Sequence, residues 1–176
     1  MISLTDDDFA LMGLPRRFQI DLKALDEYRK DLQRQAHPDR HATHGAAAQR
    51  VAMQWSVRIN EAYQRLRDPV KRAAYLCELS GAPIDAERNT AMPPEFLMQQ
   101  MQWREDLDDA QSPDAIENLL DQVVTARRDA LVRLGTLLDE QSDPQAASGV
   151  VRALMFIQRF ADDVQDRLER LQSQRQ

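Results

Sequence analysis

The chain has 176 residues, of which 43% are hydrophobic and 30% are charged, and its formal net charge is −6 at pH 7. This composition excludes an intrinsically disordered protein, and no apolar run of about eighteen residues is present that could span a membrane. Glycines are few, which favours an all-α chain, and the net charge of −8 on residues 81–176 argues against nucleic acid as the main partner.

Helical periodicity predicts four helices before residue 80, at about 6–14, 22–35, 46–67 and 69–79. Asp21 is expected to cap the second helix, and Asp68 followed by Pro69 marks the start of the fourth. Gly81 can close this last helix and Pro83 prevents its continuation, so we expect a first domain over residues 1–80.

Three longer helices are predicted after this break, at about 94–110, 113–140 and 144–171. Ser112-Pro113 and Asp143-Pro144 each place a capping side chain before a proline at the first helical position. Short connections between long amphipathic helices imply antiparallel neighbours. The sequence therefore predicts a three-helix bundle over residues 94–176, joined to the first domain by a linker at 81–93.

The second and third helices are predicted to form an antiparallel hairpin, because each has one apolar stripe. The stripes are Leu25, Tyr28, Leu32 and Ala36 on the second helix and Ala52, Trp55, Ile59, Ala62, Tyr63 and Leu66 on the third. Pro38 must stop the second helix near Ala36, which leaves His37 and Asp39 at a sharp bend between the two helices.

The opposite side of the second helix is basic, since it carries Lys23, Lys30 and Arg34 against a single acid, Glu27. Taken alone, this side is equally consistent with an ordinary solvated face. Because it lies beside a rigid, exposed polar bend, however, we expect this region to be a contact point for another protein.

Catalytic chemistry is not expected from this sequence. His37, Asp39, His41 and His44 offer nitrogen and oxygen ligands for a metal-dependent hydrolase. Pro38 keeps His37 and His41 off a common helical face, and no Glu or Cys lies nearby to complete the set. The chain also lacks a Gly-rich phosphate loop and a nucleophile elbow. We therefore expect no enzyme activity, metal or cofactor, and keep the hydrolase as an alternative.

Two further features are expected to be structural. The acidic runs 6–8 and 162–163 are predicted to be helix caps or solvated faces. Cys77 is the only cysteine, which excludes an internal disulfide and indicates a buried thiol. With an acidic N-terminal segment that lacks the features of a secretory signal, this favours a reducing, cytoplasmic location.

A set of motifs covers nearly all of residues 1–76: Tyr28, His37-Pro38-Asp39-Arg40, Ile59-Asn60-Glu61-Ala62-Tyr63, Leu66, Asp68-Pro69 and Lys71-Arg72-Ala73. This set resembles the J-domain of co-chaperones that serve DnaK-class, ATP-driven chaperones. The resemblance implies that one group of residues docks on the chaperone ATPase and triggers hydrolysis: His37, Pro38 and Asp39, with Arg29, Lys30 and Arg34.

A second set of motifs extends over the whole chain: Phe9-Ala10-Leu11-Met12-Gly13-Leu14-Pro15, Arg72-Ala73-Ala74-Tyr75-Leu76, Leu79, Gly81, Glu87, Thr90, Phe96-Leu97-Met98 and Arg104-Glu105. This set resembles the HscB family in its bacterial form, without the cysteine-rich extension of eukaryotic relatives. The resemblance implies a co-chaperone that delivers an iron–sulfur scaffold protein (IscU-type) to a specialised chaperone (HscA-type). A J-domain co-chaperone for another client remains an alternative.

The helix at 94–110 has two apolar sides, of which the bundle needs one. Phe96, Trp103 and Leu107 are expected to face the core, and Leu97, Met98 and Met101 form the other side. The last helix has its own core stripe, at Val150, Leu154, Ile157, Ala161, Val164, Leu168 and Leu171. Phe156 lies about 120° off this stripe.

The family resemblance places the client contacts on Leu97, Met98, Met101 and Phe156, with Arg104 and Glu105 as a polar rim. The alternative is that both apolar groups pack between the two domains. Met101 stands where a leucine is common in relatives. Gln99 and Gln102 stand where acids are common, so attraction to a basic scaffold is expected to be weaker.

Overall fold

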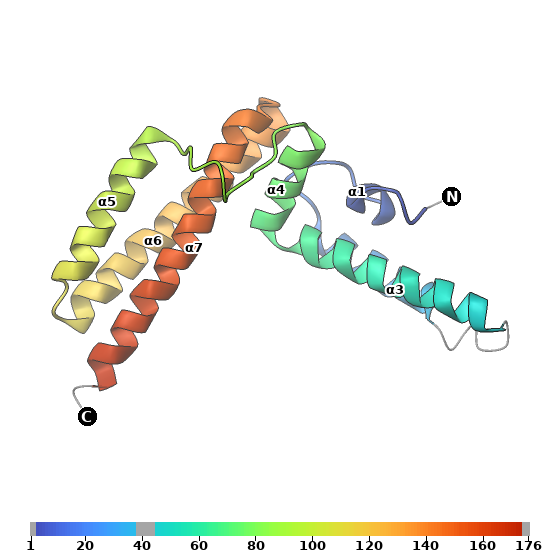
Figure 1. Cartoon of the computed structure of the whole chain (residues 1–176), viewed down its shortest axis with the longest axis horizontal. Helices are drawn as coiled ribbons and strands as arrows, with labels where there is room; N and C mark the ends of the chain where they lie inside the picture. The colour runs from blue at the N-terminus through green and yellow to red at the C-terminus, as the bar shows by residue number, and fades with distance from the viewer. Residues whose placement is uncertain (1–2, 38–44, 174–176) are drawn as a thin grey trace. The chain divides into compact units, whose positions relative to one another are not determined.

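The computed structural model describes residues 3–37 and 45–173, and every regular element within these residues is a helix. The chain divides into two compact units, Met1–Leu76 and Cys77–Gln176, and each is described by itself (Figure 1). The predicted all-α fold is confirmed. Among the described residues, no helix is both long enough and apolar enough to cross a bilayer.

The helices of the first unit follow the predicted ones closely, except at the start. They are α1 (Asp8–Leu11), α2 (Leu22–Ala36), α3 (Gly45–Arg67) and α4 (Pro69–Leu79), whose last residues belong to the second unit. α1 is shorter than expected because the Asp7 carboxylate accepts hydrogen bonds from the amides of Phe9 and Ala10 and so sets its start. Gly13, at a φ of +61°, then turns the chain away.

α2 and α3 pack against each other along the predicted stripes. Leu25 and Leu66 have no exposed surface, and Ile59 has 1%. Tyr28 is the exception, because 48% of it is exposed, so its predicted place in the core is wrong. Its ring lies against Gly13 instead, where a Cβ atom would come within 2.7 Å of the ring. Tyr28 therefore covers the turn after α1.

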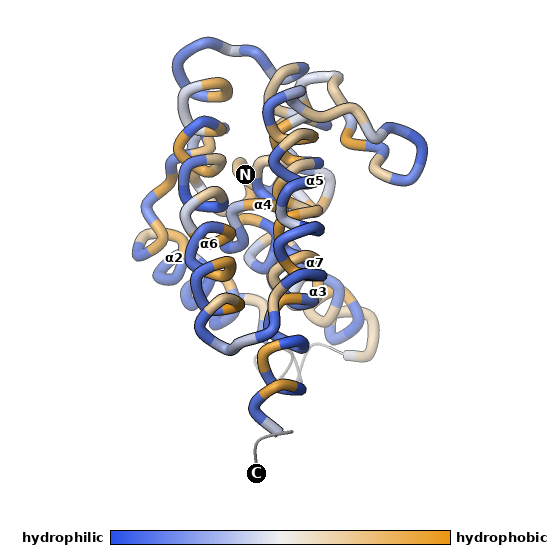
Figure 2. The backbone as a smooth tube through the Cα atoms, turned by 90° about the vertical axis from the view of Figure 1, so that its left-hand side faces the viewer, coloured by the Kyte–Doolittle hydropathy of each residue, from blue (hydrophilic) through white to orange (hydrophobic). Residues whose placement is uncertain are grey.

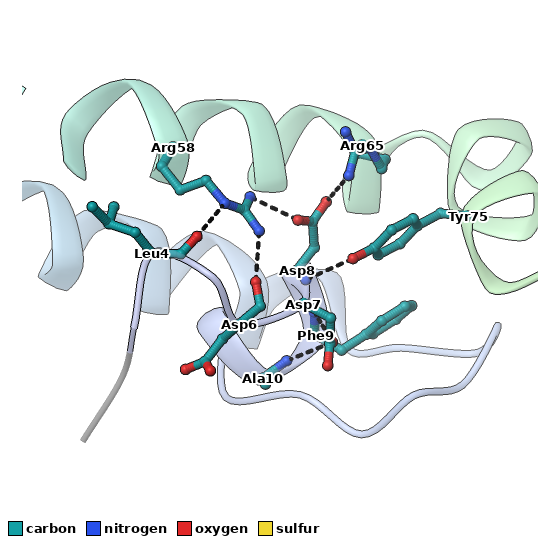
Figure 3. A network of polar contacts seen from close by, with 9 residues as sticks. All are labelled: Leu4, Asp6, Asp7, Asp8, Phe9, Ala10, Arg58, Arg65 and Tyr75. Atoms are coloured by element: carbon teal, nitrogen blue, oxygen red, sulfur yellow. Dashed lines mark hydrogen bonds and ion pairs between the residues drawn. The ribbon is translucent and has the colours of Figure 1, made fainter. Parts of the chain in front are cut away.

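Asp8 is a buried acid at the contact between α1 and α3 (Figure 3). Its carboxylate lies 2.7 Å from Arg58 and 2.9 Å from Arg65. Its backbone amide donates to the Tyr75 hydroxyl at 3.1 Å. The expectation that the whole run 6–8 caps a helix or faces solvent is therefore wrong for Asp8. Two arginines seven residues apart on α3 offset the cost of burying this charge.

The second unit contains α5 (Pro94–Asp109), α6 (Pro113–Gly135) with a π-helical continuation η2 (Thr136–Glu140), and α7 (Pro144–Ser173). Ser112 and Asp143 cap α6 and α7 as predicted, each accepting a hydrogen bond from the amide three residues later. The predicted three-helix bundle is present, since α6 packs on both α5 and α7. Hydrophobic residues recur along α6 and α7 between hydrophilic ones (Figure 2).

Residues 81–93 are not helical, and Arg152 of α7 fixes them to the bundle. Only 4% of Arg152 is exposed, and its guanidinium donates to the carbonyls of Ala91 at 2.6 Å and Ile84 at 3.0 Å. Gly81, at a φ of +78°, ends α4, and the predicted burial of Cys77 is confirmed. This segment is therefore packed onto α7 within the second unit.

Candidate functional site

The end of α2 presents His37 on the surface. The helix stops at Ala36, as predicted, and His37 has extended backbone angles (φ −62°, ψ 126°) and an exposed side chain. A proline at the next position favours this extended geometry. Pro38, Asp39, His41 and His44, which the sequence analysis singled out with it, lie outside the described residues.

A shallow groove on α2 brings the predicted chaperone-contacting residues together. Its lining is Arg29, Lys30, Gln33, Arg34 and His37, and we call it the α2 polar groove. Lys30 and Arg34 are exposed, whereas Arg29 is half-buried with its guanidinium carbon 4.5 Å from the centre of the Tyr63 ring. Tyr63 belongs to α3, so Arg29 also joins the two helices of the hairpin.

Gln33 was missed by the sequence reasoning, because a neutral residue among cations gives no signal. Its side-chain amide donates to the Ser56 carbonyl at 3.1 Å, which ties the floor of the groove to α3. Asp31 pairs with Arg34 at 2.9 Å, but both side chains are largely exposed, so the pair contributes little stability. The groove remains a cationic surface suited to an acidic partner.

An apolar patch lies on α5. Met98 is 73% exposed, Met101 is 66% exposed and Leu97 is 43% exposed, whereas Trp103 on the opposite side is 1% exposed. The two apolar sides predicted for this helix are therefore present, one buried and one in solvent. We call Leu97, Met98 and Met101 the α5 apolar patch. Exposed apolar residues that gather in one place mark a binding surface more often than scattered ones do.

Phe156 of α7 contacts α5 at Arg104, one helical turn from Met101, and also belongs to the core. Its ring centre is 5.8 Å from that of Phe96 and 5.9 Å from that of Phe160, and Phe160 stacks on Trp103 at 5.6 Å. Phe96 meets Trp103 edge-on at 6.1 Å, which closes an aromatic quartet between α5 and α7. Phe156 is thus half-buried and held in place by its neighbours.

Phe160, which is 2% exposed, is the second residue that the sequence reasoning missed. The predicted core stripe of the last helix omits Phe160, although it lies three residues after Ile157 and four before Val164, both of which belong to that stripe.

The predicted polar rim is present on α5. The Arg104 guanidinium carbon lies 5.3 Å from the centre of the Phe156 ring, within cation–π range, and Glu105 is exposed. At the start of α5, Arg133 of α6 donates to Glu95 at 2.7 Å, and this hydrogen bond holds the pKa of Glu95 below its ordinary value. The patch therefore has a fixed aromatic edge and charged flanks.

Nothing among the described residues forms a group of three or more His, Cys, Asp or Glu side chains that could hold a metal ion. The two surfaces described above are suited to binding other molecules. One is a cationic groove on the first unit, and the other is an apolar patch with an aromatic edge on the second.

Comparisons with known proteins agree with this arrangement. A family model described as the HSCB C-terminal oligomerisation domain matches residues 92–165. The chain is 52% identical to a co-chaperone protein HscB homolog of Burkholderia multivorans over 176 residues, which cover 98% of this chain and 100% of that protein. The homolog from Burkholderia vietnamiensis is 51% identical with the same coverage.

Two solved structures share the fold. The chaperone HscB from Vibrio cholerae has a TM-score of 0.76 at 34% identity and covers 97% of this chain and 100% of its own. Human co-chaperone protein HscB has a TM-score of 0.84 at 25% identity, over 93% of this chain and 83% of its own. Because sequence and fold agree over nearly the whole length, this chain belongs to the HscB family of co-chaperones.

Proposed function

We propose that this chain binds an iron–sulfur scaffold protein of the IscU type, delivers it to a DnaK-class chaperone of the HscA type, and stimulates the ATPase of that chaperone. This activity would assist the maturation of iron–sulfur proteins in the cytoplasm. The observation that carries the proposal is that one HscB-family chain holds a cationic groove on its first unit and an apolar patch on its second.

The first unit acts on the chaperone as a J-domain in this proposal. The cations of the α2 polar groove steer the encounter with an acidic patch on the ATPase domain, because complementary charge raises association rates. Asp39, which follows His37 and Pro38 in the sequence, supplies a carboxylate that a partner arginine can bind in bidentate fashion. Arg29 contributes mainly by holding α2 on α3, since its guanidinium packs on Tyr63.

The second unit holds the scaffold. The α5 apolar patch and Phe156 supply the central apolar contact, and Arg104 and Glu105 form its polar rim. Such central anchors carry most of the affinity in protein interfaces. Because one chain binds both partners, the scaffold is present at the chaperone at a raised effective concentration.

The chaperone half is tested with ATP turnover by the HscA-type chaperone in the presence of the scaffold. Wild-type protein is expected to accelerate turnover. With Asp39→Asn the increase in turnover should be smaller by about tenfold or more, because the amide cannot form a charged bidentate pair. Asp163→Asn makes the same chemical change at an exposed site on α7 and serves as the control. Equal stimulation by Asp39→Asn and wild type would contradict the assignment.

The client half is tested by calorimetry with the scaffold alone. Met98→Ala combined with Met101→Ala should weaken binding by about 2 kcal/mol, roughly thirtyfold, as loss of central apolar anchors does. Val124→Ala with Val132→Ala removes comparably exposed side chains from α6 and should change affinity little. If the chaperone is stimulated but the scaffold does not bind, the client is another protein.

A further inference from the structure

The methionines in residues 3–37 and 45–173 fall into two groups by exposure. Among the described residues, Met12 has no exposed surface, and Met92 and Met155 are half-buried. Met98, Met101 and Met53 are exposed, by 73%, 66% and 61%. Met98 and Met101 are three residues apart on α5 and therefore neighbours on the helix surface. Of the methionines that the structure describes, the two most exposed thus lie together in the α5 apolar patch.

We propose that Met98 and Met101 form a reversible oxidation site at which a peroxide controls binding of the scaffold. The inference rests on the proposed function of the α5 apolar patch. In the reaction one oxygen atom passes from the peroxide to the thioether sulfur, so an S–O bond forms as the O–O bond breaks. The sulfur loses two electrons to give the sulfoxide, and hydrogen peroxide is reduced to water.

The usual first target of a peroxide is protected in this chain. A peroxide reacts with a thiolate rather than a thiol, so the reactivity of a cysteine follows its exposure and its pKa. Cys77 has no exposed surface, and burial raises its pKa to about 11. Very little thiolate therefore exists at neutral pH, and the exposed thioethers are the accessible sulfur atoms.

Oxidation of these two residues would change the surface without disturbing the core. Their side chains face solvent, whereas α5 is fixed by Trp103 and Phe96 on its other side. A sulfoxide carries a strongly polar S–O group that must lose its water when an apolar partner docks. The flexible, apolar contact that a methionine offers becomes a polar one, so affinity for the scaffold falls.

Met53 provides a matched control inside the same molecule. It lies on α3 in the first unit and is nearly as exposed as Met101, but it is not part of the α5 apolar patch. A peroxide should oxidise it at a similar rate. Because it belongs to the other unit and is not one of the residues of the α5 apolar patch, its sulfoxide should not alter binding of the scaffold.

The experiment treats the full chain with hydrogen peroxide, removes the excess with catalase, and then measures affinity for the IscU-type scaffold by calorimetry. Peptide mass spectrometry locates each added oxygen. We expect Met53, Met98 and Met101 to be oxidised well before Met12, and the oxidised protein to bind the scaffold about tenfold more weakly or worse. Methionine sulfoxide reductases with a dithiol as reductant should restore the affinity, because the dithiol is oxidised to a disulfide while each sulfoxide returns to the thioether and its oxygen leaves as water.

Leucine variants assign the effect to residues. Met98→Leu with Met101→Leu keeps volume and hydrophobicity but cannot be oxidised, so peroxide should leave its affinity unchanged. Met53→Leu should lose affinity on oxidation as wild type does. If the double variant folds poorly, the single variants Met98→Leu and Met101→Leu show how much of the loss of affinity on oxidation comes from each methionine.

The inference is overturned if oxidised wild type binds as tightly as untreated protein, or if the double leucine variant loses affinity to the same extent. It is also overturned if circular dichroism shows that oxidation unfolds the bundle. In each of these cases untreated protein still binds the scaffold, so the proposed function stands. If untreated protein does not bind the scaffold, the proposed function fails and the oxidation site fails with it.

Discussion

The carboxylate of Asp8 has no solvent-exposed surface and lies within 3 Å of one nitrogen from Arg58 and one from Arg65, at 2.7 and 2.9 Å. A buried charge stabilises a fold only while its partners are present, because an unpaired buried ion is costly. Both arginines are partly exposed, by 21% and 43%, so water screens part of the interaction. At this position one carboxylate therefore links α1 to two turns of α3.

Asp8→Asn is expected to lower the free energy of opening of the first unit by about 2–3 kcal/mol, because the amide leaves two guanidinium groups without a counter-charge. Hydrogen exchange, evaluated separately for α1–α3 and α5–α7, measures this loss in a chain of two units, where a single unfolding free energy is poorly defined. Asp163→Asn, at an exposed position, should stay within about 0.5 kcal/mol of wild type. Equal amide protection of the first unit in Asp8→Asn and in Asp163→Asn would refute a structural role for Asp8.

Among the helices, α5 depends on few buried contacts. Within α5, all of whose residues are described, Trp103 is the one fully buried side chain, whereas α7 buries ten. The aromatic quartet therefore holds α5 on the bundle, whereas the ion pair between Glu95 and Arg133 is largely exposed and adds little stability. Rings that pack at these distances add specific geometry to the area they bury. The exposed patch on α5 is positioned by the buried rings behind it.

Phe160→Leu should destabilise this contact by about 1–2 kcal/mol, since leucine fills much of the space but cannot stack on Trp103 and Phe156. Amide protection in α5 should fall more than protection in α6, as hydrogen exchange would show. Met155→Leu changes a half-buried neighbour on α7 with little change in volume and provides the control. Equal loss of protection in α5 and α6 would mean that the quartet does not fix α5 in particular.

For the molecule as a whole, the sequence predicted the helices well because their boundaries depend on local chemistry. Asp21, Asp68, Ser112 and Asp143 each accept a hydrogen bond from an amide two or three residues ahead, so the cap can be read from neighbouring residues. The exposed apolar side of α5 was also predictable, because helical spacing separated it from the side that carries Trp103.

The sequence predicted least well where a residue depends on partners far along the chain. The burial of Asp8 requires arginines fifty and fifty-seven positions away, and periodicity carries no such information. Tyr28 fits the core stripe of α2, yet its ring rests on Gly13 because the turn after α1 passes there. Phe160 is buried because α5 supplies Trp103, a contact between separate helices.

The buried guanidinium of Arg152 determines how far the second unit can be shortened. A truncated chain that starts at Pro94 would keep this cation but lose the carbonyls of Ile84 and Ala91 that it binds. The guanidinium would then face water, and the bundle would lose two hydrogen bonds from a charged donor, each contributing about 1.5–3 kcal/mol, which is a large part of the stability of a small bundle. The smallest fragment expected to fold by itself therefore begins upstream of Ile84.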